Sequence, residues 1–236
     1  MSNILFDVKR VQLQMVRDRG YLISDELNIL DMTEEEFVDY YTEKVQELVL
    51  EASVPESSSK KKTSINERII LTNTYYTDPG VVPQKSIYVM YTNEKTASKD
   101  NIAKRAVDAF TAVAINHDEA ILITDAVIPK TTLNELTKLA KKVRWQVFTE
   151  DELVFNPTEH VSVPKHTKLS TKEANSIFKE MGVTRATLPI INLNDPISRY
   201  YNYEIGDVIE IERDDNYLTT LAQKSLAYRI VFKREV

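Results

Sequence analysis

The feature that most constrains the fold is a change of hydrophobic period along the chain. Residues 1–52 place apolar side chains at helical spacing, whereas residues 66–150 alternate short apolar runs with helical stretches. The run Ala120-Ile121-Leu122-Ile123 is apolar at every position, which is typical of a strand buried on both faces. Further strands are expected near 67–75, 86–92 and 145–148. This order predicts an α/β layer with at least one right-handed crossover.

Two helices are predicted before this layer. Gly20 is placed to end the first, and a capping box of Thr33 with Glu36 starts the second. Residues 23–56 contain eleven acidic side chains and one basic one, Lys44, which predicts an acidic exposed surface. The apolar faces of the two helices are expected to consist of Ile4, Val8, Val11 and Met15, and of Phe37, Tyr41, Val45 and Leu48.

Two breaks divide the chain. The polar, Ser-rich segment 53–64 indicates a linker or exposed loop. Its Lys60–Lys62 run could be a localisation signal or a phosphate contact, but so short a run is more typical of a solvated loop. The turn signal Asn156-Pro157 marks a domain boundary. Residues 1–156 hold 19 basic and 25 acidic side chains, whereas residues 157–236 hold 11 of each. We therefore expect an α+β protein with domains 1–156 and 157–236.

The second domain is expected to combine two helices with a small sheet. A capping box of Ser170 with Glu173 begins the first helix, Gly182 ends it, and Asp195-Pro196 begins the second. Strands are expected near 207–212 and 226–232. The inward face of the first helix is expected to consist of Ala174, Ile177, Phe178 and Met181.

Composition excludes several chemistries. The chain has no cysteine, so disulfides, thiol nucleophiles and Cys-type metal centres are excluded. Its four glycines are too scattered for a phosphate loop or a dinucleotide turn. The formal net charge of −6 argues against a globally basic nucleic-acid binder. We expect no cofactor, no metal site and no membrane span.

Two metal-dependent alternatives depend on residue spacing. His160 and His166 would lie about 20 Å apart on an ideal strand, too far for one ion. A two-metal nuclease site would need an acidic residue and a Glu-x-Lys pair on one strand face. Asp125 follows the central strand, but no Glu-x-Lys lies on an expected strand. Solvated strand ends are therefore the favoured interpretation, and a nuclease remains the alternative.

Aromatic residues suggest a partner surface. Tyr200, Tyr201 and Tyr203 follow a short predicted helix, which cannot turn all three rings inward, so exposed aromatic area is expected there. Tyr75, Tyr76, Tyr88 and Tyr91 could stack bases, but tyrosines on strands more often pack a half-exposed sheet.

Several C-terminal motifs resemble the assembly domain of the fifth shared subunit of eukaryotic RNA polymerases, a family that includes an archaeal counterpart. Near the N-terminus, residues 17–22 (Arg-Asp-Arg-Gly-Tyr-Leu) resemble the opening helix of the eukaryotic form. The C-terminal motifs extend over about 70 residues and are 160–166 (His-Val-Ser-Val-Pro-Lys-His), Leu188-Pro189, 195–201 (Asp-Pro-Ile-Ser-Arg-Tyr-Tyr), 206–213 (Gly-Asp-Val-Ile-Glu-Ile-Glu-Arg) and Tyr228-Arg229-Ile230.

The resemblance implies a non-catalytic polymerase subunit in the nucleus. Its second domain would dock on the largest subunit, among other polymerase subunits. Its first domain would form a nuclease-like lower jaw near downstream DNA in the assembled enzyme, without an active site. The implied contact residues are Pro164, Lys165, His166, Leu188, Pro189, Asp195, Pro196, Arg199, Tyr200, Tyr201, Gly206, Tyr228 and Arg229.

Two departures from the family pattern affect the expected docking surface. Ile190 stands where the family usually has arginine, and residues 214–224 replace a short glycine-containing turn. The abundance of Asn, Ile, Lys and Tyr would suit an AT-rich genome, such as that of a large DNA virus, in which case the protein would act in the host cytoplasm, a viral factory or the virion. A transcription-associated adaptor outside the core enzyme is the third function class.

Overall fold

The chain folds as two compact units, residues 1–155 and 156–236. A computed structural model describes residues 4–52, 67–92, 100–125, 127–131, 133–134, 143–214 and 224–233. The segment 53–64 and most of the replaced segment 214–224 lie outside the described residues. So do Thr132 and Glu135, for which the sequence predicts a further helix-starting capping box. The mixture of helices and sheets confirms the expected α+β class.

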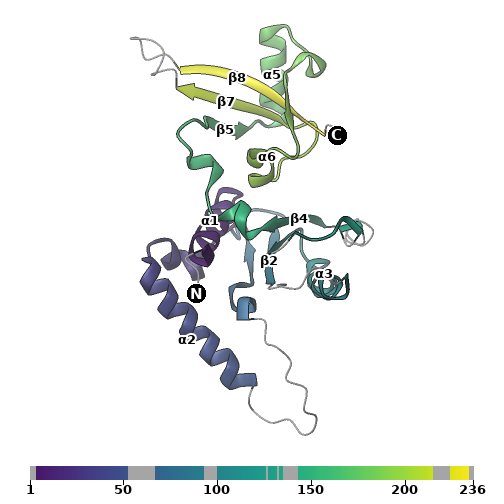
Figure 1. The fold of residues 1–236 in the computed structure, drawn as a ribbon. Helices are drawn as coiled ribbons and strands as arrows, with labels where there is room; N and C mark the ends of the chain where they lie inside the picture. The colour runs from purple at the N-terminus through teal and green to yellow at the C-terminus, as the bar shows by residue number, and fades with distance from the viewer. Residues whose placement is uncertain are drawn as a thin grey trace. The chain divides into compact units, whose positions relative to one another are not determined.

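The first unit is built on a four-stranded sheet in the order β1-β2-β3-β4 (Figure 1). β1 (Asn73–Tyr76) is antiparallel to β2 (Ser86–Thr92), and β3 (Glu119–Thr124) and β4 (Arg144–Thr149) continue the sheet in parallel. The strands predicted near 86–92, 120–123 and 145–148 are confirmed. Ala120 to Ile123 have no exposed surface, as expected for a central strand covered on both faces.

Helices cover both faces of this sheet. Because strand side chains alternate, Tyr88, Met90 and Leu122 face α3 (Asp100–Ala114) and pack around its Phe110. On the opposite face, the hydroxyl of Tyr91 donates to Gln12 of α1 (Ile4–Asp18). The sheet is thus the middle layer of the unit, and α1 is the element that closes its second face.

The helical start of the first unit follows the expected capping signals. Gly20 has φ 90°, and its amide donates a hydrogen bond to the Arg17 carbonyl, which ends α1. After η1 (Ser24–Leu30), the Thr33 amide donates to Glu36 and the Glu36 amide donates to Thr33 Oγ1, which forms the predicted capping box before α2 (Glu34–Ala52). The Thr33 amide and the Thr33 hydroxyl both donate to the Glu36 carboxylate, and these two hydrogen bonds lower its pKa.

The strand expected over residues 67–75 is confirmed only in its second half. Asn73–Tyr76 form β1, but Glu67–Leu71 form the 3-10 helix η2, and the Thr72 amide donates to the Ile69 carbonyl. Side-chain and carbonyl contacts of η2 with α1 and with the strand ends outweigh the strand propensity of this run.

The second unit contains a smaller sheet in the order β5-β7-β8-β6 (Figure 1). β5 (Lys165–Lys168), β7 (Val208–Asp214) and β8 (Lys224–Phe232) are successive antiparallel neighbours, and β6 (Ile190–Asn192) lies parallel to β8. Its helices are α5 (Thr171–Met181) and α6 (Pro196–Tyr200). Short 3-10 turns are η3 (Glu150–Leu153) in the first unit and η4 (Pro157–Glu159) and η5 (Arg185–Thr187) in the second.

Local signals set the helices of the second unit. Ser170 and Glu173 form the predicted capping box, and Gly182 ends α5 with φ 65°. Asp195 accepts a hydrogen bond from the Ile197 amide, and Pro196 occupies the first turn of α6, as expected. Met181 is 53% exposed rather than inward, because it lies in the last turn beyond the contact made by Ala174.

Two features are absent from the described part of the chain. Within the described ranges, no helix combines the length and apolar character needed to cross a bilayer. No three metal-binding side chains converge on one point in the same part of the chain.

Candidate docking site

A groove of about 950 Å³ opens on the second unit. It is bounded by the segment that leads into β5, the start of α6, the middle of β6, the carboxyl-terminal part of β7 and Arg229 of β8. Five of the predicted contact residues share this groove, although they come from three separate sequence motifs. Its lining is formed by Val161, Ser162, Val163, Pro164, Lys165, His166, Ile191, Asp195, Ile197, Ile211, Glu212, Arg213 and Arg229.

The sheet register brings the motifs together. His166 of β5 lies opposite Ile211 of β7, and Ile209 of β7 lies opposite Arg229 of β8. The floor is apolar, because Ile191, Ile197 and Ile211 belong to the buried core of this unit. Polar and charged side chains surround an apolar floor, which is the usual composition of a binding surface.

His166 has a defined hydrogen-bond arrangement. Its Nδ1 lies 2.7 Å from the carbonyl oxygen of Pro164, and a carbonyl can accept but not donate, so Nδ1 carries the proton. In the neutral ring, Nε2 is therefore a hydrogen-bond acceptor. Burial lowers the pKa of His166, and the charges of Arg229 and Arg213 lower it further, while the Pro164 hydrogen bond and Asp195 oppose this. The side chain is neutral at physiological pH.

Charges of both signs line the groove. Lys165, Arg213 and Arg229 contribute positive charge, whereas Asp195 and Glu212 contribute negative charge. Asp195 is also committed to the start of α6, because its Oδ1 accepts from the Ile197 amide at 2.9 Å. The groove therefore offers basic groups on all three neighbouring strands and a carboxylate fixed by a helix start.

One edge of the sheet lies at the groove. Within the described residues, β5 pairs with β7 on one side and has no strand on the other. The Leu169 amide donates to the Val208 carbonyl, so by antiparallel alternation the backbone groups of His166 and Lys168 point away from β7. These groups are placed to pair with an added extended chain.

Other predicted contact residues lie inside the unit and not in the groove. Tyr200 is 2% exposed and its hydroxyl accepts from Asn156, and Leu188 is buried beside Ala174 and Val208. As surface contacts these two assignments are wrong, because the α6 and η5 segments turn the side chains inward. Tyr228 packs against the same Leu188 cluster.

The exposed aromatic area expected from the three tyrosines is small, and it comes from Tyr201. Tyr203 is buried, and the half-buried Tyr201 stacks on it with ring centroids 5.4 Å apart. Tyr200 meets Tyr201 edge-on at 5.1 Å. Asn202 has φ 54°, which lets the chain turn after α6 and brings all three rings into one packed group.

The remaining predicted residues have backbone roles. Pro189 is exposed, and its carbonyl accepts from the Ile230 amide. Gly206 has φ 92° and donates its amide to the Val231 carbonyl. Pro196 and the half-buried Arg199 belong to α6, where the Arg199 amide donates to the Asp195 carbonyl.

The segment before β5 is not extended throughout, although the histidine-spacing estimate assumes an ideal strand. The Val163 amide donates to the His160 carbonyl, and the Ser162 amide donates to His160 Nδ1. This turn exposes Val161, whose side chain is 83% accessible at the groove. The extended entry begins at Pro164, because proline favours an extended predecessor and cannot continue the turn's hydrogen bonding.

Sequence reasoning missed Glu212 and Arg213 as groove residues. Both belong to the 206–213 motif, but the signal needed was the pairing of β5 with β7, which places Lys165 opposite Glu212. Those strands are about 40 residues apart in the sequence, and their register has no local signature.

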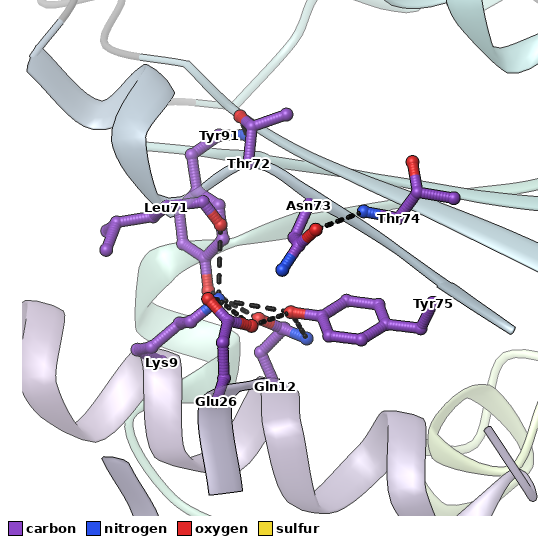
Figure 2. A network of polar contacts seen from close by, with 9 residues as sticks. All are labelled: Lys9, Gln12, Glu26, Leu71, Thr72, Asn73, Thr74, Tyr75 and Tyr91. Atoms are coloured by element: carbon purple, nitrogen blue, oxygen red, sulfur yellow. Dashed lines mark hydrogen bonds and ion pairs between the residues drawn. The ribbon is translucent and has the colours of Figure 1, made fainter. Parts of the chain in front are cut away.

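A second polar centre lies inside the first unit (Figure 2). Lys9 has no exposed surface, and its ammonium lies 3.0 Å from Glu26, 3.1 Å from the Tyr75 hydroxyl and 3.2 Å from the Leu71 carbonyl. The Tyr75 hydroxyl in turn donates to Glu26. Burial lowers the pKa of Lys9, although Glu26 opposes this, and burial raises that of Tyr75. This network joins α1, η1, η2 and β1, and it leaves Tyr75 unavailable for stacking bases.

The N-terminal motif has a comparable structural role. The Arg19 guanidinium donates to Gln146 Oε1 at 2.6 Å and to Glu119 Oε2 at 3.3 Å, so it joins the end of α1 to β3 and β4. Its side chain is 3% exposed. Within this motif, Arg19 and Tyr21 are therefore the side chains enclosed by the unit, whereas Arg17 and Leu22 are exposed.

Two folded units, one of them with a groove beside a strand edge that is open within the described residues, are suited to a subunit that docks on a larger assembly. Residues 2–107 match the family model described as RNA polymerase Rpb5, N-terminal domain, and residues 155–231 match RNA polymerase Rpb5, C-terminal domain. The chain belongs to the RNA polymerase Rpb5 family, as the motif resemblance predicted, and it is a non-catalytic RNA polymerase subunit.

Individual relatives agree with the family match. The chain is 28% identical over 214 residues to DNA-directed RNA polymerase subunit 5-like protein 1 of Arabidopsis thaliana, which covers 89% of each protein. It is 25% identical over 232 residues to DNA-directed RNA polymerases I, II, and III subunit RPABC1 of Caenorhabditis elegans, covering 96% of this chain and 95% of the relative. It is 40% identical over 79 residues to DNA-directed RNA polymerase subunit Rpo5 of Thermofilum pendens, covering 34% of this chain and 94% of the relative.

Proposed function

We propose that the second unit docks on the largest subunit of a DNA-directed RNA polymerase, and that the groove is the docking site. One observation carries this proposal. Residues of four separate family motifs line one groove, and they are represented by Lys165, Asp195, Arg213 and Arg229. The groove also adjoins the open edge of β5, where backbone groups are placed to pair with an extended chain.

A paired charge reversal tests the groove. Lys165→Glu with Arg229→Glu should sharply reduce the recovery of the largest polymerase subunit when the tagged chain is purified at high salt. Lys172→Glu with Lys179→Glu is the matched control, because both lysines are exposed on α5, away from the groove. Normal recovery with a folded groove variant would contradict the proposal, as would equal loss in the control.

We propose further that the first unit forms the lower jaw of the polymerase, near downstream DNA, and that the protein works in the nucleus. Residues 1–156 carry a net charge of −6, so the isolated chain is expected to bind DNA weakly. A gel shift at physiological salt should give a midpoint above micromolar, and DNA crosslinks to this unit should appear in the assembled enzyme. Submicromolar binding by the isolated chain would contradict this assignment.

Subunit stoichiometry separates this function from the alternatives. A core subunit should be recovered at one copy per largest subunit after a high-salt wash. Substoichiometric, salt-labile recovery would indicate an adaptor outside the core enzyme. Recovery of the chain alone, together with Mg²⁺-dependent cleavage that is lost in Asp125→Asn, would indicate the nuclease.

A further inference from the structure

The carboxyl ends of the parallel strands in the first unit hold a buried ion triad. Asp125 directly follows β3 and Glu150 directly follows β4, and the last paired residues, Thr124 and Thr149, lie opposite each other. The two carboxylates therefore leave the sheet at the same edge. This is the edge at which α/β layers commonly bind ligands.

Arg68 reaches this edge from η2, a separate part of the chain. Its Nη2 donates a hydrogen bond to Glu150 Oε2 at 3.0 Å, and its Nε lies 2.9 Å from Glu150 Oε1 as an ion-pair contact. Its Nη1 lies 3.4 Å from Asp125 Oδ2. The three side chains are 10–12% exposed, so water screens the triad little.

We propose that the Arg68 guanidinium occupies the place between Asp125 and Glu150 that a divalent cation would take in a metal-dependent α/β enzyme. Such an enzyme needs carboxylates free to hold the metal and activate water. Here the strand-end carboxylates are held by a permanent cation of the chain itself, since arginine stays protonated in proteins. The residues present therefore do not fit a bound metal, and Arg68 is the reason.

Removing the guanidinium should convert the triad into a cation site. Arg68→Gln keeps much of the side-chain length but removes the charge, leaving two nearby carboxylates without this partner. Two such carboxylates supply oxygen ligands of the kind that hard divalent cations prefer. Arg68→Lys keeps a positive charge and should keep metal out, although it lacks the planar guanidinium that reaches both carboxylates.

Mn²⁺ binding by the full-length chain, followed by electron paramagnetic resonance, tests the proposal. Arg68→Gln should bind one Mn²⁺ at least tenfold more tightly than the unmodified chain, and adding Asp125→Asn should abolish that gain. Arg144→Gln is the matched control, because Arg144 pairs with Glu119 at the opposite end of β3, at 3.7 Å. The Arg144→Gln variant also loses one positive charge, but it leaves Asp125 and Glu150 paired with Arg68.

A thermal unfolding experiment tests the proposal even if Arg68→Gln is destabilised. Millimolar Mn²⁺ should raise the melting temperature of Arg68→Gln by several degrees relative to NaCl of equal ionic strength, and should not do so for Arg68→Lys or Arg144→Gln. A folded Arg68→Gln that binds Mn²⁺ no better than Arg144→Gln would overturn the proposal. Equal Mn²⁺ binding by the unmodified chain would overturn it too, as would the absence of melting rescue.

Discussion

The ammonium of Lys9 lies 3.0 Å from the carboxylate of Glu26, in a part of the first unit where Lys9 has no exposed surface (Figure 2). Removing one partner of a buried ion pair leaves the other charge without compensation, at a cost of about 3–5 kcal/mol. We predict that Lys9→Met lowers the free energy of unfolding of the first unit by about that amount. Urea unfolding followed by circular dichroism measures it.

Two variants control this prediction. Lys9→Met with Glu26→Gln should recover much of the loss, because the uncompensated carboxylate is then gone. Lys44→Met should have no measurable effect, because the Lys44–Glu47 pair is exposed on α2. A loss in Lys9→Met no larger than in Lys44→Met would show that the buried network contributes little to stability.

Alkaline pH should destabilise the first unit through its buried tyrosines. Burial raises the pKa of Tyr75 and Tyr91 well above the usual value, and the charge of Glu26 raises both further. The folded chain therefore keeps protons that the unfolded chain releases above about pH 10. The contribution of these two tyrosines to the free energy of unfolding is fully present below about pH 10, and it is lost as the pH rises above that value.

Absorbance at 295 nm and far-ultraviolet circular dichroism, recorded together from pH 8 to 12.5, measure this effect. Part of the tyrosine ionisation should coincide with loss of helical signal. Tyr91→Phe should reduce the dependence of stability on pH in this range. Complete tyrosine ionisation in a chain that keeps its helical signal would refute the prediction.

His166 gives the second unit an opposite pH dependence. Burial is the main cause that lowers its pKa, and the positive charges of Arg229 and Arg213 add to it. The unfolded chain binds this proton more readily than the folded chain. The contribution of His166 to the free energy of unfolding is therefore fully present above the histidine pKa of the unfolded chain, about 6.5, and falls as the pH drops below it. The melting temperature of the second unit should therefore fall between pH 7 and 5.5, and His166→Gln should reduce that fall. An unchanged pH profile in His166→Gln would show that other groups cause it.

Local signals predicted much of the fold. The capping box of Ser170 with Glu173 and the Asp195-Pro196 helix start are formed as expected, because each depends on neighbours within three residues. Within the strand predicted over 67–75, only Glu67–Leu71 depart from the prediction, because contacts of η2 with distant residues such as Lys9 decide its form. Chain-local patterns hold no information about such contacts.

The candidate site was predicted less completely than the fold. Pro164, Lys165 and His166 belong to one motif and reach the groove together, but their alignment with Arg213 depends on strand register. The surface assignment of Tyr200 rests on the argument that one short helix cannot bury three aromatic rings. The turn at Asn202 packs the three rings into one group, and a positive φ at an asparagine has no reliable sequence signal.

Arg229 and Tyr201 should affect polymerase incorporation in different ways. Arg229 lines the groove, whereas Tyr201 packs on Tyr203 in the core of the second unit. We predict that Arg229→Ala leaves the melting temperature nearly unchanged but weakens co-purification with the largest polymerase subunit. Tyr201→Ala should lower the melting temperature first, because truncating a packed aromatic ring costs about 3–5 kcal/mol when it is fully buried and less here, where it is half-buried. Differential scanning fluorimetry and quantitative co-purification, applied to both variants and to the double variant, separate the two effects.

If Arg229→Ala is incorporated normally while folded, the groove is not the docking surface. If Tyr201→Ala keeps its melting temperature but loses incorporation, Tyr201 contacts the partner directly.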